Sequence, residues 1–457
     1  MDSQKPPVPR LFGTDGVRGH ANKHPMTVEV ALALGRAAGK IFRRHNGKHR
    51  VVIGKDTRLS SYMFENALIA GLCSMGIDTL MVGPLPTPGV AFITRAYRAD
   101  AGIVISASHN NFHDNGIKFF SSEGFKLPDS VEKEMEELAH QGDFSGCLPD
   151  DDKIGKNTKI VDAQGRYVEY VKGTFPRKKS LKNLSVVLDC AHGAAYTVAP
   201  LVFQELDAKV KVYCNTPNGI NINDQCGSLH PEVIQKAVLE QKADVGIALD
   251  GDGDRVIMVD ENSQIVDGDQ ILAICAHDMM RRGELHNKRV VATVMSNGGF
   301  LAAMKHLGIE VITSQVGDRY VIQEMLTHET NLGGEPSGHL INLDYNTTGD
   351  GLCTALQVLR IMIETDSKLS DLASIAPRFP QTLLNVRVRT KPPIEEIPGL
   401  SVGVAAATQQ LGTAGRVLVR YSGTENVLRI LVEGQKKKQI AQIASSLGSL
   451  ITKEIGG

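Results

Sequence analysis

Residues 102–120 read G-I-V-I-S-A-S-H-N-N-F-H-D-N-G-I-K-F-F, two short apolar runs separated by a polar loop. The run at 103–105 predicts a short buried strand, and the loop closes on an Asn-Gly dipeptide at 115–116 that is typical of tight turns. Open α/β sheets bind ligands at the carboxyl ends of their strands. The hydroxyl of Ser108 and the imidazole of His109 therefore mark a candidate site, in which the serine would need activation to act as a nucleophile.

This loop alone does not decide the function. Serine, histidine and asparagine are ordinary loop residues, so a loop of this composition, taken alone, is more often structural than functional. Several more polar loops of unusual composition follow downstream, however, and each lies beside an apolar, strand-like run. Their combination favours a functional site assembled from distant segments.

Length and composition limit the class of protein. A chain of 457 residues exceeds a single core, which predicts three or four domains. The composition, with 42% hydrophobic residues and 45 glycines, is that of a soluble α/β protein with many tight turns. The net charge of −1 gives no signal for nucleic acid or a membrane surface, so any anion site must be local.

Cysteine usage and the amino terminus indicate the compartment. The seven cysteines are scattered and include no C-x-x-C pair, so the sequence predicts neither a zinc ribbon nor a disulfide framework. The first ten residues contain no apolar signal region, and no run of 18 apolar residues could span a bilayer. A cytoplasmic location is therefore predicted.

Alternating strand and helix patterns predict an α/β fold of four domains, three α/β units with mixed sheets covered by helices and a small α+β unit at the end. The predicted domains are residues 1–155, 156–255, 256–374 and 375–457. The segment Pro377-Arg-Phe-Pro380 predicts a linker or hinge before the last domain. Two other short stretches look structural, with 54–58 predicted as a surface loop and 84–88 as a proline-rich turn.

The sharpest motif is Asp250-Gly-Asp-Gly-Asp-Arg255, directly after the apolar run V-G-I-A-L. Three carboxylates separated by glycines can wrap one hard cation, because glycine lets the backbone curl without a clashing Cβ. An EF-hand needs glycine where Arg255 stands, and its flanks would be helices rather than the strands predicted here. A plain acidic turn is the other alternative, but three unpaired charges would repel. One Mg²⁺ per subunit is favoured, since three ligands leave positions for phosphate and water.

Another loop, Arg420-Tyr-Ser-Gly-Thr-Glu-Asn426, offers an anion site. Backbone N–H groups and hydroxyls at 422–424 can form a nest for phosphate, and Arg420 or Arg429 can add a bidentate contact. The alternative is a turn between two strands with solvated arginines. The loop matches neither a Walker A motif nor G-x-G-x-x-G, and the chain contains neither.

Further polar groups occur in three other segments. The loop at 333–339 places Glu335, Ser337 and His339 close together, a set that suits vicinal hydroxyls on a sugar ring, although each alone is more often structural. Arg18 adds a cation in a glycine-rich turn. Lys118 is flanked by apolar residues, and its burial is expected to lower its pKa toward a general acid/base role.

Taken together, these loops resemble those of the α-D-phosphohexomutase superfamily across nearly the whole chain. S-A-S-H-N at 106–110 resembles its phosphoserine loop, and D-G-D-G-D-R at 250–255 its metal loop. G-E-P-S-G-H at 334–339 is similar to its sugar-binding loop, and R-Y-S-G-T-E-N at 420–426 to its phosphate-binding loop. Four motifs in the same order are jointly very specific, and they imply four domains around a central cleft.

Within the superfamily, the motifs at 12–19, 218–228 and 347–351 resemble the bacterial phosphoglucosamine mutases. They fit the phosphomannomutase/phosphoglucomutase branch less well, and that branch is the alternative. One departure is Asn111, which stands where the family usually has proline. Proline would stiffen the loop by fixing φ, but its loss removes no chemical group.

The resemblance implies a role for each matching residue. Ser108 would be the phosphorylated residue, and it would also contribute to the metal site. The implied catalytic residues are Ser108, His109, Lys118 and Arg18, the implied metal ligands are Ser108, Asp250, Asp252 and Asp254, and the implied substrate-binding residues are Arg255, Glu335, Ser337, His339, Arg420, Ser422, Gly423, Thr424, Asn426 and Arg429.

The implied reaction interconverts glucosamine 6-phosphate and glucosamine 1-phosphate through a 1,6-bisphosphate, for UDP-N-acetylglucosamine and cell-wall synthesis. Glucosamine 1,6-bisphosphate or a related hexose bisphosphate would be the activator, and the fourth domain would close about a hinge at 375–382. The expected partner is a small sugar phosphate, with no nucleic acid and no membrane, and a homodimer is left open.

Two functions of other classes are disfavoured by the residues. A hydrolytic serine enzyme would be expected to show G-x-S-x-G and a legible triad, and neither is found. A non-catalytic sugar-phosphate sensor would not need all three aspartates of the metal loop together with Ser108 and Lys118.

Overall fold

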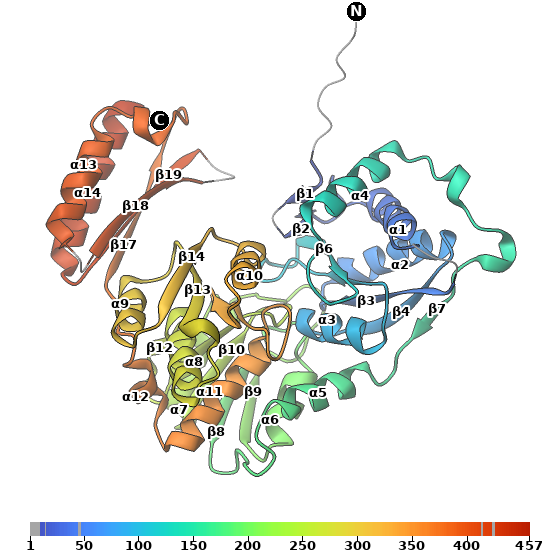
Figure 1. The fold of residues 1–457 in the computed structure, drawn as a ribbon, viewed down its shortest axis with the longest axis horizontal. Helices are drawn as coiled ribbons and strands as arrows, with labels where there is room; N and C mark the ends of the chain where they lie inside the picture. The colour runs from blue at the N-terminus through green and yellow to red at the C-terminus, as the bar shows by residue number, and fades with distance from the viewer. Residues whose placement is uncertain (1–9, 14, 44–46, 413–414, 423–425) are drawn as a thin grey trace, which may run out of the picture. The chain divides into compact units, whose positions relative to one another are not determined.

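The protein is described here by a computed structural model, covering residues 10–13, 15–43, 47–412, 415–422 and 426–457 (Figure 1). The chain forms two compact units, one made of Met1–Met295 and Ile309–Ser374 and the other of Ser296–Gly308 and Ile375–Gly457. Three helix-covered sheets lie in the first unit and a three-stranded sheet lies in the second. No described helix is both long and apolar enough to cross a membrane.

The first sheet has seven strands in the order β1-β2-β6-β5-β3-β4-β7. These strands are β1 (Phe12–Gly13), β2 (Gly16–His20), β3 (His49–Lys55), β4 (Ile77–Pro84), β5 (Ala101–Ile105), β6 (Asp114–Ser121) and β7 (Asn157–Lys159). β3, β4, β5 and β7 are parallel, whereas β6 runs antiparallel to β5. The carboxyl ends of β3 and β5 therefore meet at one edge, where the Asp56 N–H donates to the Ile105 carbonyl at 3.0 Å.

Helices cover both faces of this sheet (Figure 1). α1 (Val28–Phe42), α2 (Leu59–Ser74) and α4 (Asp129–Gln141) pack on one face, and α3 (Thr87–Ala96) packs on the other. Thr27 caps α1, with its hydroxyl accepting from the Val30 N–H. α1 and α2 lie close together because Gly35 and Gly71 face each other between them.

Helix α3 was not expected from the sequence. Residues 84–88 predicted a turn because prolines usually interrupt helices, yet α3 begins at Thr87 with Pro88 in its first turn. The N–H groups of the first turn have no partner within the helix, so proline costs nothing there. This helix places Thr87 next to the loop that contains Asp252.

The second sheet has the order β12-β11-β10-β8-β9. Its elements are β8 (Ser185–Asp189), β9 (Lys209–Tyr213), β10 (Val245–Leu249), β11 (Val256–Asp260) and β12 (Ile265–Val266), with α5 (Ala163–Gly173), α6 (Val198–Gln204) and α7 (Glu232–Gln241). β8, β9 and β10 are parallel, whereas β11 pairs antiparallel with β10. Loops that begin at Asp189, Cys214 and Asp250 therefore share one edge.

Two of the expected domain boundaries fall inside sheets. The boundary expected between 255 and 256 separates β10 from β11, although the two strands pair along their whole length. The boundary expected between 155 and 156 precedes β7, which pairs with β4 of the first sheet. Both segments are short strands at the end of a domain, and only long-range pairing identifies the sheet to which they belong.

The third sheet has the order β14-β13-β15-β16. Its elements are β13 (Arg289–Thr293), β14 (Glu310–Ser314), β15 (Leu332–Gly334) and β16 (Leu340–Asn342), with α8 (Gly268–Arg282), α10 (Asp318–Thr327), α11 (Gly351–Thr365) and α12 (Leu369–Ala373). β13, β14 and β15 are parallel, and β16 returns antiparallel to β15. The hairpin between β15 and β16 holds the loop that contains Glu335 and His339.

The second unit is a three-stranded antiparallel sheet with helices. It contains α9 (Gly298–His306), β17 (Gln381–Arg387), α13 (Leu400–Leu411), β18 (Gly415–Tyr421), β19 (Val427–Gly434) and α14 (Lys437–Ile455). Its strand order is β17-β19-β18. The predicted class, three α/β units with mixed sheets and a small α+β domain at the end, is confirmed.

The predicted hinge segment is anchored within the second unit. Asn297 caps α9 by accepting from the Gly299 N–H, and the same side-chain oxygen accepts from the Phe379 N–H at 2.9 Å. Its amide nitrogen donates to the Phe379 carbonyl at 3.1 Å. One asparagine therefore satisfies both backbone groups of a residue between the two prolines of the hinge.

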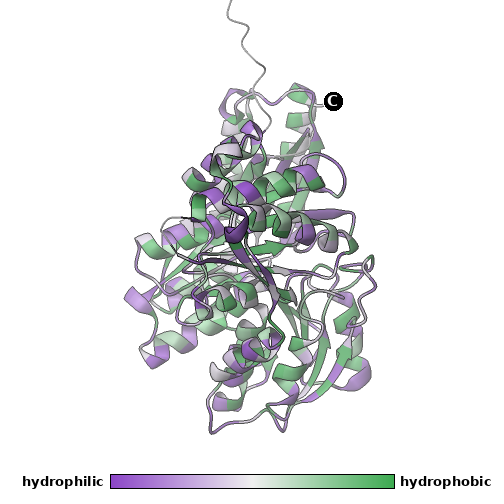
Figure 2. Cartoon of the chain, turned by 90° about the vertical axis from the view of Figure 1, so that its right-hand side faces the viewer, coloured by the Kyte–Doolittle hydropathy of each residue, from purple (hydrophilic) through white to green (hydrophobic). Residues whose placement is uncertain are grey.

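Hydropathy follows this architecture (Figure 2). The helices carry hydrophobic and hydrophilic residues in turn, as helices with one buried face do. β5, β10 and β11 are buried over their full length, as expected of strands covered by helices on both faces. Because these strands end in loops at the sheet edge, polar groups collect where the apolar core stops.

The helix contact between α1 and α2 yields a test of the packing. A Cβ on Gly71 would lie 2.5 Å from the Leu32 carbonyl oxygen, so Gly71→Ala must push the helices apart and should cost about 1–3 kcal/mol of unfolding free energy. Gly165 in α5 has no atom within 4 Å of such a Cβ, so the control Gly165→Ala should gain about 0.5–1 kcal/mol. Thermal unfolding of both variants checks this, and equal midpoints would contradict the described packing.

Candidate active site

The serine loop begins at the end of β5 with a buried Ser108. Its side chain and backbone are 1% exposed, and its φ of +51° lies in the left-handed region that non-glycine residues rarely adopt. The Ser108 N–H donates to the Ser106 hydroxyl at 2.9 Å. This backbone conformation turns the Ser108 hydroxyl toward Asp250, whose Oδ2 accepts from it at 2.7 Å.

Arg58 holds the serine loop through hydrogen bonds to its backbone carbonyls. Its guanidinium is fully buried and donates to the carbonyls of Ser108 at 3.0 Å, Asn110 at 2.7 Å and Asn111 at 2.9 Å. Its Nε also donates to Asp56 at 2.9 Å. The expectation that 54–58 forms a surface loop is wrong, because the buried guanidinium of Arg58 donates to three carbonyls and a buried carboxylate.

The metal loop follows β10 as predicted. Asp250, Asp252 and Asp254 are all buried, and one oxygen of each lies within 4.8 Å of the others. Asp252 Oδ1 is buried and has no hydrogen-bond partner among the described residues. A Cβ on Gly251 would lie 2.6 Å from the Ser108 carbonyl oxygen, so glycine is required where the two loops meet. This carboxylate set fits one hard divalent cation.

The pKa values of these carboxyls reflect their crowding. Burial, together with the charges of Asp254 and Asp252, raises the pKa of Asp250 well above its usual range. Burial acts in the same direction on Asp254, but His339 and Lys118 outweigh it and hold its pKa below the usual range. Neighbouring carboxyls whose pKa values shift in opposite directions are typical of functional sites.

Lys118 lies among carboxylates. Its Nζ is 2.9 Å from Asp252 Oδ2, 3.5 Å from Asp15 Oδ2 and 3.8 Å from Asp254 Oδ2. Burial alone would lower the pKa of Lys118, but these three carboxylates outweigh burial and raise it. The expectation of a lowered pKa is therefore wrong, because the sequence showed the apolar neighbours of Lys118 but not its distant acidic partners.

The Arg18 turn joins the same network. Arg18 and Lys126 both contact the carboxylate of Asp15, and Lys126 also pairs with Asp318 Oδ2 at 2.5 Å. Arg18 is about a quarter exposed, so its guanidinium reaches solvent. Sequence reasoning assigned no role to Asp15, which lies within the 12–19 motif, and it missed Lys126 and Asp318, which are single charged residues without a motif.

His109 contacts the serine hydroxyl, with 3.3 Å between its Nδ1 and Ser108 Oγ. Burial lowers the pKa of His109 to about 4, and the charges of Arg255 and Arg18 act in the same direction. The imidazole is therefore neutral near pH 7. It can accept or donate one hydrogen bond without adding charge.

The predicted sugar loop lies beside the metal loop. The Glu335 carboxylate accepts from the Gly317 N–H at 2.8 Å and from the Ser337 hydroxyl at 3.2 Å. His339 Nδ1 is 3.5 Å from Asp254 Oδ1. Burial would lower the pKa of His339, but Asp254 outweighs it and raises the value to about 8.

Arg255 completes this cluster of the first unit. Its backbone N–H donates to Asp250 Oδ1 at 3.2 Å, and its Nε lies 3.8 Å from Asp254 Oδ1. The structure thus brings together the predicted residues of the serine, metal and sugar loops. Thr87 and Asn223 were missed, although Thr87 donates to Asp252 Oδ2 at 2.7 Å and Asn223 to the Ser108 carbonyl at 2.8 Å.

The predicted phosphate loop belongs to the second unit. Arg420 on β18 lies directly opposite Arg429 on β19, and Arg429 donates to the Ser422 hydroxyl at 3.4 Å. Asn426 is exposed, and its carbonyl accepts from the Val388 N–H. Gly423 and Thr424 lie outside the described residues. Two arginines paired across adjacent strands, one of them bonded to a hydroxyl, form a cationic patch that suits an anion.

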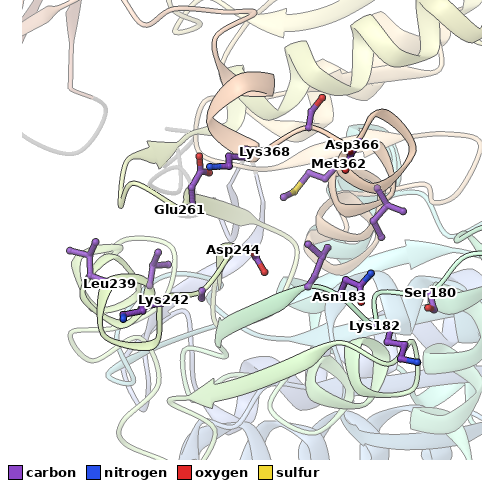
Figure 3. Close-up of a pocket in the computed structure, with 15 residues that line it drawn as sticks. Ser180, Lys182, Asn183, Leu239, Lys242, Asp244, Glu261, Met362, Asp366 and Lys368 are labelled. Atoms are coloured by element: carbon purple, nitrogen blue, oxygen red, sulfur yellow. The ribbon is translucent and has the colours of Figure 1, made fainter.

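A cavity of about 800 Å³ in the first unit is separate from this cluster (Figure 3). Lys182, Lys242, Asp244 and Lys368 are among the residues that line it. Its lining charges are mixed in sign, and no residue predicted from the sequence lines it. The predicted site residues of the first unit therefore lie in the loop cluster and not along this cavity.

Replacing Arg58 tests the support of the serine loop. Arg58→Lys keeps the charge but cannot donate to three carbonyls and Asp56 together, so it should lower the unfolding free energy by about 2–4 kcal/mol. The control Arg166→Lys changes an exposed arginine that pairs with Asp162 on one helix face, and should leave the unfolding midpoint unchanged. Calorimetry compares the two variants. An Arg58→Lys protein as stable as the control would show that Arg58 does not support the serine loop.

Family models match all four parts of the chain. They are the phosphoglucomutase/phosphomannomutase alpha/beta/alpha domain I at 9–146, domain II at 165–264, domain III at 267–379 and the C-terminal domain at 383–447. The fold agrees with solved structures of related proteins. A phosphoglucomutase/phosphomannomutase family protein from Burkholderia thailandensis superposes with a TM-score of 0.80 at 24% identity, covering 97% of both chains.

An Aspergillus fumigatus N-acetylphosphoglucosamine mutase, solved with GlcNAc-6P and magnesium, superposes with a TM-score of 0.69 at 17% identity. It covers 97% of this chain and 96% of its own. At this identity the likeness shows the fold alone.

Curated relatives are much closer in sequence. The phosphoglucosamine mutase of Protochlamydia amoebophila is 68% identical over 447 residues, covering 98% of both chains. That of Chlamydia caviae is 61% identical over 448 residues, also covering 98% of both. The chain therefore belongs to the α-D-phosphohexomutase superfamily and, within it, to the phosphoglucosamine mutases.

Proposed function

We propose that this protein interconverts glucosamine 6-phosphate and glucosamine 1-phosphate, with Ser108 as the residue that carries the phosphoryl group between the two positions. The observation that supports this most is the buried hydroxyl of Ser108, 2.7 Å from Asp250 in a cluster of three aspartates. Membership of the phosphoglucosamine mutases supplies the substrate. The relatives are bacterial enzymes, and we propose a cytoplasmic location with them.

The proposed metal is one Mg²⁺, held by Asp250, Asp252, Asp254 and an oxygen on Ser108. Asp252 Oδ1 has no hydrogen-bond partner among the described residues, and burial together with repulsion from Asp254 and Asp252 raises the pKa of Asp250; both observations support a dication here. When bound, Mg²⁺ would offset charge on phosphoryl oxygens. Oxygen-only ligands favour Mg²⁺ over softer ions.

Phosphoserine adds about −1.5 to −2 charges and the substrate phosphate adds a similar load, so the site needs cations. Lys118 supplies one that stays protonated, because its carboxylate neighbours raise its pKa. Arg18, partly open to solvent, and Arg255 supply two more beside the cluster. In this proposal, these residues position and neutralise the phosphoryl group and do not exchange protons.

In the first half-reaction, the bond between phosphorus and Ser108 Oγ breaks as a bond from the free sugar hydroxyl to phosphorus forms. The sugar hydroxyl loses its proton, and the product is a 1,6-bisphosphate. In the second half, the other phosphoryl group returns to Ser108 Oγ and the sugar oxygen regains a proton. His109, neutral near pH 7 and adjacent to Ser108 Oγ, is the proposed proton carrier.

The sugar must bind in two orientations, which separates recognition of the ring from recognition of the distal phosphate. Glu335, Ser337 and His339 are the proposed ligands for ring hydroxyls that both orientations share. Arg420, Ser422, Gly423, Thr424, Asn426 and Arg429 are the proposed grip on the phosphate that is not reacting. We propose that the last domain closes about the 375–382 hinge when this phosphate binds.

Replacing the nucleophile tests the reaction. Ser108→Ala should abolish both isomerisation and covalent labelling by radioactive hexose bisphosphate, with thermal unfolding unchanged. The control Ser106→Ala removes a buried hydroxyl two residues away that accepts from the Ser108 N–H. It should retain covalent labelling, with turnover reduced about 10-fold as the loop loses that bond. Full activity of Ser108→Ala would refute the proposal.

The alternative is a phosphomannomutase/phosphoglucomutase, the name that the matching domain families carry. Turnover on glucosamine 6-phosphate, glucose 6-phosphate and mannose 6-phosphate separates the two. A kcat/KM highest on glucosamine 6-phosphate supports the mutase proposed here, and a higher value on mannose or glucose 6-phosphate favours the alternative.

Replacing the paired arginines tests the phosphate grip. Arg420→Gln and Arg429→Gln should each raise KM about 10-fold or more, because each removes a charge-assisted hydrogen bond to phosphate, with a smaller effect on covalent labelling of Ser108. Lys453→Gln removes a well-exposed cation from α14 of the same unit and should leave KM unchanged. Steady-state kinetics on glucosamine 6-phosphate provide the comparison, and an unaltered KM in both arginine variants would count against this grip.

A further inference from the structure

A second cluster of possible metal ligands lies at the carboxyl edge of the second sheet. His192, Cys214 and Cys226 each place one donor atom within 4.8 Å of the other two. His192 lies in the loop after β8, Cys214 directly follows β9, and Cys226 precedes α7. The three residues are far apart in the sequence, so no C-x-x-C spacing could reveal the cluster.

Backbone contacts hold the cluster together. The His192 N–H donates to the Cys214 carbonyl at 2.6 Å, which places the two side chains on adjacent loops. The Gly227 N–H donates to Asp189 Oδ2 at 2.9 Å, which fixes the loop that carries Cys226. Hydrogen bonds of the backbone therefore hold the loops that carry the three donor residues close together.

The chemistry of the three donors favours a soft cation. Two thiolates on one tetrahedral zinc lie about 3.8 Å apart, given Zn–S bonds of about 2.3 Å. The described spacing needs to contract by about 1 Å at most to reach this geometry. The Thr216 N–H donates to His192 Nδ1 at 3.2 Å, so Nδ1 is the unprotonated nitrogen, and ligation would replace this long hydrogen bond.

Burial leaves one side of the cluster open. Cys226 is 2% exposed, whereas His192 and Cys214 are half-buried, so an ion can enter from solvent. The fully buried Asp189 carboxylate lies within hydrogen-bonding reach of the Cys214 thiol. A water molecule or this carboxylate can complete four-coordination, as in other sites with two cysteines and one histidine.

We propose that His192, Cys214 and Cys226 form a zinc site, separate from the aspartate cluster and specific for a different kind of ion. Thiolate and imidazole ligands select Zn²⁺, whereas the three carboxylates of the metal loop suit Mg²⁺. The two sites therefore select different ions through the chemistry of their ligands, although both lie at the edge of the same sheet.

The proposed site is connected to the serine loop on two sides. The His192 carbonyl accepts from the Thr57 hydroxyl at 2.6 Å. Thr57 directly precedes Arg58, which donates to the backbone carbonyls of the serine loop. On the loop that carries Cys226, Asn223 donates to the Ser108 and Asn110 carbonyls at 2.8 Å each. Zinc at this site would fasten the segments that hold the backbone of Ser108 in its left-handed conformation.

Cobalt(II) provides a direct readout, because thiolate ligation to cobalt gives a charge-transfer absorption in the near ultraviolet. The full-length reduced protein, with Mg²⁺ in excess, is titrated with Co²⁺. The wild type should develop this absorption to one equivalent and lose it when Zn²⁺ is added. Cys214→Ser and Cys226→Ser should each lose most of it, and Zn²⁺ should raise the unfolding midpoint of the wild type but not of these two variants.

Two control variants locate the effect. Cys147→Ser removes a half-buried thiol on another domain and should keep the absorption. Asp250→Asn alters the aspartate cluster and should also keep it. If Cys226→Ser fails to fold, the more exposed Cys214→Ser and His192→Ala decide. The absence of a thiolate–cobalt band in the wild type, or its persistence in both Cys214→Ser and Cys226→Ser, would overturn the proposal.

Discussion

The hydrogen bond from Ser108 Oγ to Asp250 Oδ2 joins two loops that are 142 residues apart in the sequence. Each loop follows a fully buried strand, β5 in the first sheet and β10 in the second. A bond of 2.7 Å between buried groups can persist only if both sheets hold their edges in register. The candidate site therefore depends on how the first two domains pack, more than on either loop alone.

Charge balance is the second constraint on this site. Asp15, Asp252 and Asp254 surround Lys118, and Lys126 connects Asp15 to Asp318. An isolated buried charge is expensive, whereas a network of opposite charges can be retained. The network extends from the first sheet to the third. The ion pairs that balance the buried charges therefore also connect domains.

The sequence predicted those features whose chemistry is local. The glycines of the metal loop are needed because each neighbouring aspartate must turn inward within a few residues, and this pattern is visible in a single motif. β10 and β11 were likewise predicted from unbroken apolar runs. Helix α3 was missed because Pro88 was taken as a helix breaker, although proline is well tolerated in a first turn.

The features that sequence reasoning missed depend on long-range contacts. Arg58 interacts with backbone carbonyls, which every residue has, so nothing in the sequence marks its partners. The pKa of Lys118 was predicted in the wrong direction because its acidic neighbours come from two other loops. The cluster of His192, Cys214 and Cys226 was missed for the same reason, since its members come from three separate loops.

The glycines where the loops meet have a consequence for how the enzyme family can diversify. A Cβ on Gly116 would lie 2.6 Å from the Ser106 carbonyl oxygen, and one on Gly251 would lie equally close to the Ser108 carbonyl oxygen. Main chain is therefore packed against main chain where these loops meet, and neither glycine can be replaced without moving its neighbour. Changes in sugar specificity are therefore expected in the side chains around these contacts, while the two glycines that fix the serine and metal loops stay the same.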